Sequence, residues 1–150
     1  MIETLMLTLS YPLRLMATFL AVGVLKLCGV AVAVDRTLMT VGEKGQGIAV
    51  TDACSGLEQL GALILVGAVF AWMMQKGLGW RLFHWGMILP SLILSNALRL
   101  VVTVLLYNGM GEVILGDAWH HGLGYAQSVL VLVFLWLFGL LIQRLSAPEK

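Results

Sequence analysis

Three kinds of side chain that could together carry out acyl transfer occur in separate parts of the chain. They are the thiol of Cys54, the guanidinium of Arg99 and the imidazoles of His120 and His121. A thiolate can attack a carbonyl carbon, an imidazole can move the proton, and a fixed positive charge can stabilise the oxyanion. These residues therefore indicate cysteine chemistry at a carbonyl if the fold brings them together.

Each of these residues also has a structural interpretation. Most membrane cysteines are small apolar fillers, although Cys54 lies where a helix N-terminus is expected to favour the thiolate. Arg99 precedes the predicted outer end of its helix, near Tyr107, by about 12 Å, a depth at which a charge needs a polar partner. Glu58 is a candidate partner for Arg99 or for Lys26, so an ion pair that serves assembly alone is the alternative.

The composition indicates an integral membrane protein. The 150 residues are 60% hydrophobic and 11% charged, with a mean hydropathy of +0.96, whereas soluble domains carry roughly a quarter charged residues. A net charge of +1 gives no footprint for nucleic acid. Cys28 and Cys54 form neither a disulfide framework nor a metal cluster, and no motif predicts a metal or another cofactor.

Four apolar stretches are long enough to cross a bilayer. We therefore predict an all-α integral membrane fold, a single domain over residues 1–150 built as a four-transmembrane-helix bundle. A small extracytoplasmic hairpin, with strands at 37–41 and 47–51, is expected before the second helix. Pro90 is expected to kink the third helix. The predicted spans are residues 11–34, 55–75, 82–107 and 122–143.

The basic residues predict the orientation. Lys76 and Arg81 lie between the second and third spans, and Arg144 follows the fourth, whereas segment 108–121 has no Lys or Arg. Positive residues stay on the cytoplasmic side, so both termini are expected in the cytoplasm. The default location of the protein is the inner membrane of the cell. His84 is then expected at the inner interface, away from the candidate site on the periplasmic side.

Three short motifs give the sequence a family resemblance. They are A-C-S-G-L at residues 53–57, N-x-x-R ending at Arg99, and H-x-x-x-G running from His120 to Gly124. In this order and at these membrane positions, the sequence resembles the exosortase/archaeosortase family of membrane-embedded cysteine transpeptidases. The resemblance covers roughly residues 25–138.

The resemblance implies a role for each residue. Cys54 would be the nucleophile, Arg99 the oxyanion stabiliser, and His120 the general acid and base, because His120 rather than His121 lies four residues before Gly124. Supporting or substrate-binding roles are expected for a further group: Asn96, Glu58, Ser55 and His121.

The resemblance also implies the substrate, a membrane-anchored protein with a C-terminal sorting signal. The enzyme would cleave it at the outer face of the membrane through a Cys54 thioester and transfer the product to an acceptor. Many family members have additional helices, so this chain is either a compact member or one that works with a partner membrane protein in the lipid. The alternative is a non-catalytic scaffold or transporter subunit in which Arg99, Glu58 and Lys26 form an interhelical ion network.

Overall fold

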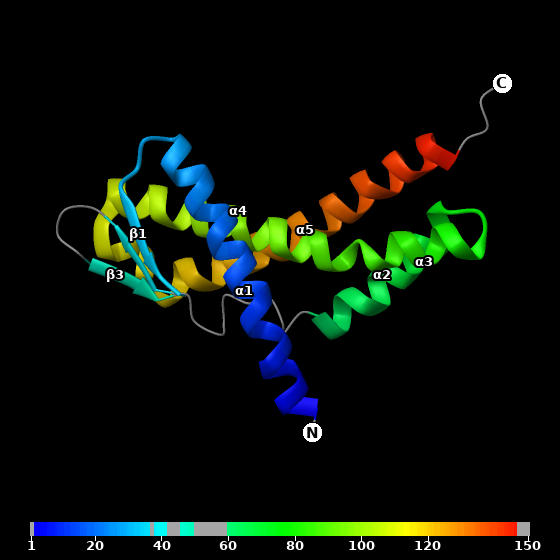
Figure 1. Cartoon of the computed structure of the whole chain (residues 1–150), viewed down its shortest axis with the longest axis horizontal. Helices are drawn as coiled ribbons and strands as arrows, with labels where there is room; N and C mark the ends of the chain where they lie inside the picture. Colours follow the sequence, from blue (N-terminus) through cyan, green and yellow to red (C-terminus); the bar gives the residue numbers. More distant parts are fainter. Residues whose placement is uncertain (1, 37, 42–45, 50–59, 147–150) are drawn as a thin grey trace.

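A computed structural model describes residues 2–36, 38–41, 46–49 and 60–146. Helices dominate this part of the chain, and a small sheet follows the first of them in chain order and lies at one end of the molecule (Figure 1). In chain order the elements are α1 (Ile2–Leu27), β1 (Val32–Asp35), β2 (Leu38–Val41), β3 (Gln46–Ala49), α2 (Leu60–Met74), α3 (Leu78–Gly86), α4 (Ile88–Met110), the 3-10 helix η3 (Gly111–Leu115) and α5 (Asp117–Ser146).

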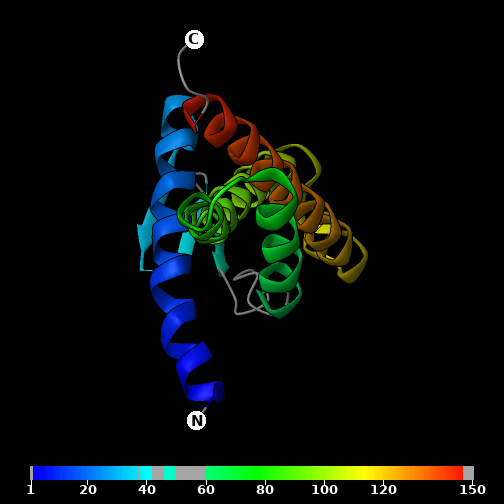
Figure 2. The ribbon, with the colours of Figure 1, turned by 90° about the vertical axis from the view of Figure 1, so that its right-hand side faces the viewer.

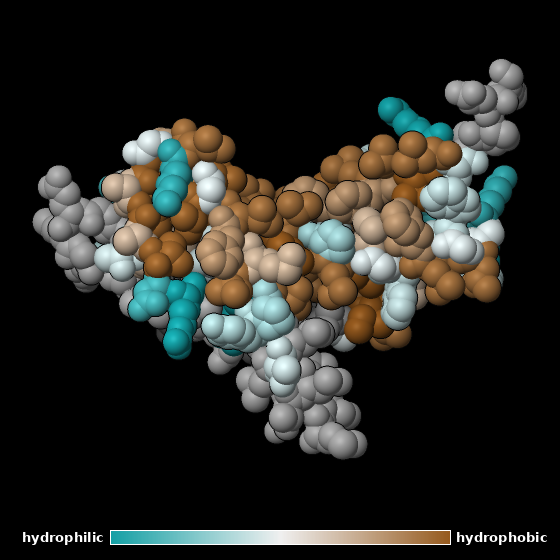
Figure 3. Space-filling view, viewed as in Figure 1, coloured by the Kyte–Doolittle hydropathy of each residue, from teal (hydrophilic) through white to brown (hydrophobic). Residues whose placement is uncertain are grey.

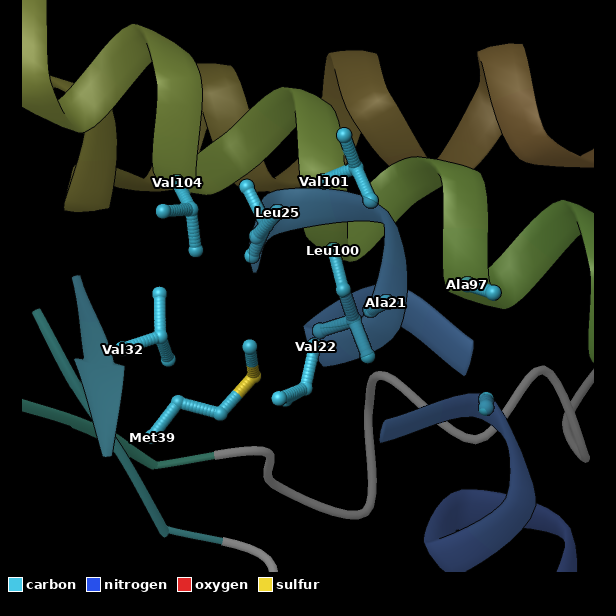
Figure 4. Packing of buried hydrophobic residues seen from close by; sticks show 10 residues of the cluster. Ala21, Val22, Leu25, Val32, Met39, Ala97, Leu100, Val101 and Val104 are labelled. Atoms are coloured by element: carbon cyan, nitrogen blue, oxygen red, sulfur yellow. The ribbon is translucent and has the colours of Figure 1, made fainter. Parts of the chain in front are cut away.

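Helices α4 and α5 run side by side along the long axis of the molecule, whereas α1 crosses α4 steeply (Figures 1 and 2). Ala17 and Ala21 of α1 are fully buried at this crossing, and Ala97 lies on the α4 side. Small side chains allow two helix backbones to approach closely. The same core continues to the sheet through a set of larger apolar residues (Figure 4): Val22, Leu25, Val32, Met39, Leu100, Val101 and Val104.

Two helical segments, Leu78–Met110 and His121–Ser146, are long and apolar enough to cross a membrane, and Gly61–Met74 is a shorter apolar helix. Apolar side chains cover most of the middle of the face shown in Figure 3, and the strongly hydrophilic residues gather toward its two ends. The structure is thus consistent with an all-α membrane protein. The count of four spans stays a prediction.

The predicted hairpin is confirmed, but the boundaries of the first helix were wrong. Strands β2 and β3 pair antiparallel, with Met39 opposite Ile48, and β1 adds a third strand to β2. Helix α1 covers residues 2–27 instead of 11–34. It ends in a Schellman motif: Gly29 has φ +78°, its N–H donates to the Lys26 carbonyl, and the Val30 N–H donates to the Leu25 carbonyl.

The early end of α1 changes the position of Lys26. The residue lies in the last turn of the helix and is exposed, not deep inside a span. An ammonium group at this place interacts favourably with the negative end of the helix dipole. Glu58 lies outside the described residues, so the ion network of the alternative interpretation stays a prediction.

The predicted third span consists of two helices, α3 and α4, separated at Met87. Pro90 has no N–H to donate to the carbonyl of Gly86, four residues earlier, so the regular helical ladder is interrupted at this point. The Ser91 N–H donates to the Met87 carbonyl at 3.0 Å and restarts the ladder. The expected irregularity near Pro90 is therefore present.

Candidate active site

The structure describes some of the predicted site residues and leaves out others. Cys54, Ser55 and Glu58 lie outside the described residues. The backbone of His120 lies in the first turns of α5, but its side chain is outside the described part. Three predicted residues can be placed completely: Asn96 and Arg99 of α4 are buried, and His121 of α5 is exposed.

Arg99 lies between α4 and α5 with only 8% of its surface exposed. Its Nη1 donates a hydrogen bond of 2.9 Å to Oε1 of Gln127 on α5. A hydrogen bond that involves a charged donor is stronger than one between neutral groups, which helps to hold a guanidinium at this depth. The sequence suggested Glu58 as a partner, which lies outside the described residues, and Gln127 was not considered. The available signal was an amide in the first third of the most apolar predicted span, residues 122–143.

The lengths of α4 and α5 bring Arg99 and Gln127 level with each other. Arg99 precedes the last residue of α4 by a stretch of about 16 Å, and Gln127 follows the first residue of α5 by about 15 Å. The two helices are antiparallel and joined by η3. The hydrogen bond therefore connects two points at equal depth below this end of the molecule.

The second half of the Gln127 amide is unusual. Because arginine only donates hydrogen bonds, Oε1 is the amide atom of Gln127 that faces Arg99. The other amide atom, Nε2, does not take part in this hydrogen bond. Gln127 is 2% exposed, and its Nε2 is buried with no hydrogen-bond partner among the described residues. An unsatisfied buried donor costs about 1–3 kcal/mol, and such a group in a native protein calls for a functional or structural explanation. Oδ1 of Asn96, an acceptor, is likewise buried with no hydrogen-bond partner among the described residues.

Arg99 and Gln127 line a hollow of about 180 Å³ between α4 and α5. A water molecule takes about 30 Å³ of liquid, so the hollow has room for a small polar group and part of its carbon chain. Its other walls are mainly aliphatic. The lining residues are Ser95, Leu98, Arg99, Val102, Leu123, Ala126, Gln127 and Leu130.

The helical register of α5 separates the two neighbouring histidines. Gln127 follows His120 by seven residues, which places their Cα positions within about 20° of the same helix face. Gln127 follows His121 by six residues, which leaves these two about 120° apart. His121 is exposed. The backbone of α5 thus places His120, and not His121, on the face that meets Arg99.

A second polar cluster lies at the other end of the molecule, where the turn between α2 and α3 packs against α5. His84 is completely buried, and it lies away from Arg99 as expected. Its Nε2 donates to the Leu135 carbonyl at 2.8 Å, and its Nδ1 lies 3.4 Å from Nε2 of Gln75. The same Gln75 nitrogen donates to the Gly139 carbonyl at 2.9 Å. This arrangement ties three helices together and uses His84 structurally.

Comparison with known proteins identifies the family. The model of the transmembrane exosortase family (Exosortase_EpsH) matches residues 1–137. The chain belongs to the exosortase family. Comparisons with curated proteins and with solved structures gave no match. Membership in a transmembrane exosortase family, together with the long apolar helices, supports a membrane location for this exosortase.

Proposed function

We propose that this exosortase is a cysteine protease/transpeptidase for C-terminal sorting signals. It would cut an exported, membrane-anchored protein at the outer face of the membrane and pass the acyl group from Cys54 to an acceptor. The observation that carries this proposal is the buried Arg99, which lines a hollow on the α5 face that also bears His120. The family match adds independent support.

In the proposed reaction, His120 takes the thiol proton of Cys54, and Sγ forms a bond to the carbonyl carbon of the substrate. The electron pair of the carbonyl moves to its oxygen, and Arg99 stabilises this oxyanion. One such donor in a poorly hydrated site contributes roughly 3–4 kcal/mol. The oxyanion then collapses, the C–N bond breaks, and His120 protonates the leaving amine. An amine acceptor or water releases the acyl group from the resulting thioester.

The supporting residues and the topology belong to the same proposal. We assign Asn96, Ser55, Glu58 and His121 to substrate binding or support of the site. Both termini are proposed to face the cytoplasm and the site the periplasm. In favour of this orientation, the α2–α3 turn and the end of α5 lie at one end of the molecule, and the sheet lies at the opposite end (Figure 1). The basic Lys76, Arg81 and Arg144 belong to the first of these ends.

The test compares the two thiols of one chain. Purified full-length protein in mild detergent is incubated with p-nitrophenyl acetate, and acetylation of each cysteine is followed by peptide mass spectrometry. Cys28 is exposed and serves as the internal control. We expect Cys54 to be acetylated much faster than Cys28, and this advantage should disappear in Arg99→Met. Equal rates at the two thiols would reject the enzyme and favour the non-catalytic scaffold.

A further inference from the structure

The hollow between α4 and α5 has a second polar group that no motif of the family resemblance includes. Gln127 lies in α5, is 2% exposed, and lines the hollow together with Arg99. Polar groups at membrane depth are costly and mark functional positions by default. We therefore expect the amide of Gln127 to have a role in addition to its hydrogen bond with Arg99.

The two ends of the amide have different surroundings. Oε1 accepts the 2.9 Å hydrogen bond from Nη1 of Arg99, which aligns the guanidinium. Nε2 is buried and has no partner among the residues that the structure describes. A rigidly held N–H donor without a competing acceptor is what stabilises charge that develops on an oxygen atom. An amide with a purely structural role would have hydrogen-bond partners for both its oxygen and its nitrogen, and the Gln127 nitrogen has none within the described part of the chain.

The amide of Gln75 provides the comparison within this chain. It is also 2% exposed, and its Nε2 donates to the Gly139 carbonyl at 2.9 Å. The two buried glutamines therefore differ in one respect that bears on function. The nitrogen of Gln75 donates to a backbone carbonyl, and the nitrogen of Gln127 has no hydrogen-bond partner among the described residues.

We infer that Gln127 is a second oxyanion donor of the active site: its Oε1 positions Arg99, and its Nε2 donates to the substrate carbonyl oxygen. The inference rests on the proposed function. In each acylation, Sγ of Cys54 forms a bond to the carbonyl carbon, and the π electron pair of the carbonyl moves to its oxygen. This oxygen accepts hydrogen bonds from Arg99 and Gln127. When the pair returns, the bond to the leaving group breaks.

The experiment uses two reagents that differ in one physical respect. Acetylation by p-nitrophenyl acetate passes through an oxyanion and expels p-nitrophenolate, whereas alkylation by iodoacetamide displaces iodide at a saturated carbon and forms no oxyanion. The ratio of the two rates at Cys54 therefore reports oxyanion stabilisation separately from thiolate reactivity and from folding. It is measured in full-length wild type, Gln127→Glu, Gln127→Met and the control Gln75→Met.

Gln127→Glu is the decisive variant, because it keeps an oxygen acceptor for Arg99 and removes both N–H groups. We expect the acetylation-to-alkylation ratio to fall about 100-fold in Gln127→Glu and in Gln127→Met, with alkylation unchanged. Gln75→Met should keep the wild-type ratio. A wild-type ratio in Gln127→Glu would overturn the donor role.

Failure of the proposed function gives a different result. In that case wild-type Cys54 would show the same ratio as the exposed thiol of Cys28, and the proposal for Gln127 would fall with it. Parallel losses of both rates in the Gln127 variants would show that Gln127 maintains the fold only, and would also overturn the inference.

Discussion

A methyl group added at Gly139 tests the packing of α5 against the α2–α3 turn. The Cβ of Gly139→Ala would lie 2.7 Å from Cε1 of His84 and 2.7 Å from both Sδ and Cε of Met74. The end of the Met74 side chain can move at little cost. The His84 ring cannot, because Cε1 lies between two ring nitrogens that face Leu135 and Gln75.

The expected loss of stability follows from three contributions. Alanine favours a helix over glycine by about 1 kcal/mol, which works in favour of Gly139→Ala. Overpacking in a filled interior costs about 1–3 kcal/mol, and stretching one His84 hydrogen bond costs about 0.5–1.5 kcal/mol. We therefore expect the free energy of unfolding to fall by about 0.5–3.5 kcal/mol.

Unfolding is measured in mild detergent with an increasing mole fraction of SDS, monitored by helical circular dichroism. Gly23→Ala is the matched control, because Gly23 lies in a helix and a Cβ there would meet nothing within 4 Å. The control should be as stable as wild type or more stable. If Gly139→Ala unfolds together with Gly23→Ala, the rigid placement of His84 is refuted.

Three further changes have definite expected outcomes. In Gly67→Ala the new Cβ would lie 2.6 Å from Cδ1 of Ile88, so the free energy of unfolding in the same SDS titration should fall by about 1–3 kcal/mol. Gly61→Ala is the control, because a Cβ there meets nothing within 4 Å, and it should lose no stability. His84→Leu removes the hydrogen bonds of the ring and should lower the free energy of unfolding by about 1–3 kcal/mol, and unchanged stability would contradict its structural role. Arg99→Lys keeps the charge but loses the planar fork, so the ratio of acetylation to alkylation at Cys54 should fall about 100-fold; a wild-type ratio would show that charge alone is sufficient.

The sequence contained enough information for the hairpin and for the kink near Pro90, because turn residues and proline act locally. The sequence also contained signals for the end of α1, but the prediction did not use them. Gly29 supplies the left-handed residue of a helix terminus, and the V-A-V-A-V run that follows has the two-residue period of a strand. Hydropathy alone extended the helix over this run, because an apolar strand and an apolar helix have the same composition.

Side-chain pairings across helices could not be predicted in the same way. The contacts of Gln127 with Arg99 and of His84 with Leu135 join residues 28 and 51 positions apart. Which residues meet depends on the lengths and rotation of both helices, and an error of one residue turns a side chain by about 100°. A polar residue in an apolar segment could nevertheless be recognised as one that needs a partner.

The most direct test of the central claim is the pH dependence of Cys54 alkylation in the Cys28→Ala background. Wild type, His120→Ala and His121→Ala are treated with iodoacetamide between pH 5 and 9, and the modified fraction is measured by intact mass spectrometry. We expect rapid alkylation of Cys54 well below the ordinary thiol pKa of about 8.5. This reactivity should be lost in His120→Ala and kept in His121→Ala. If the pH profile of wild type matches that of an ordinary thiol, or is the same in all three proteins, Cys54 is not a nucleophile activated by His120.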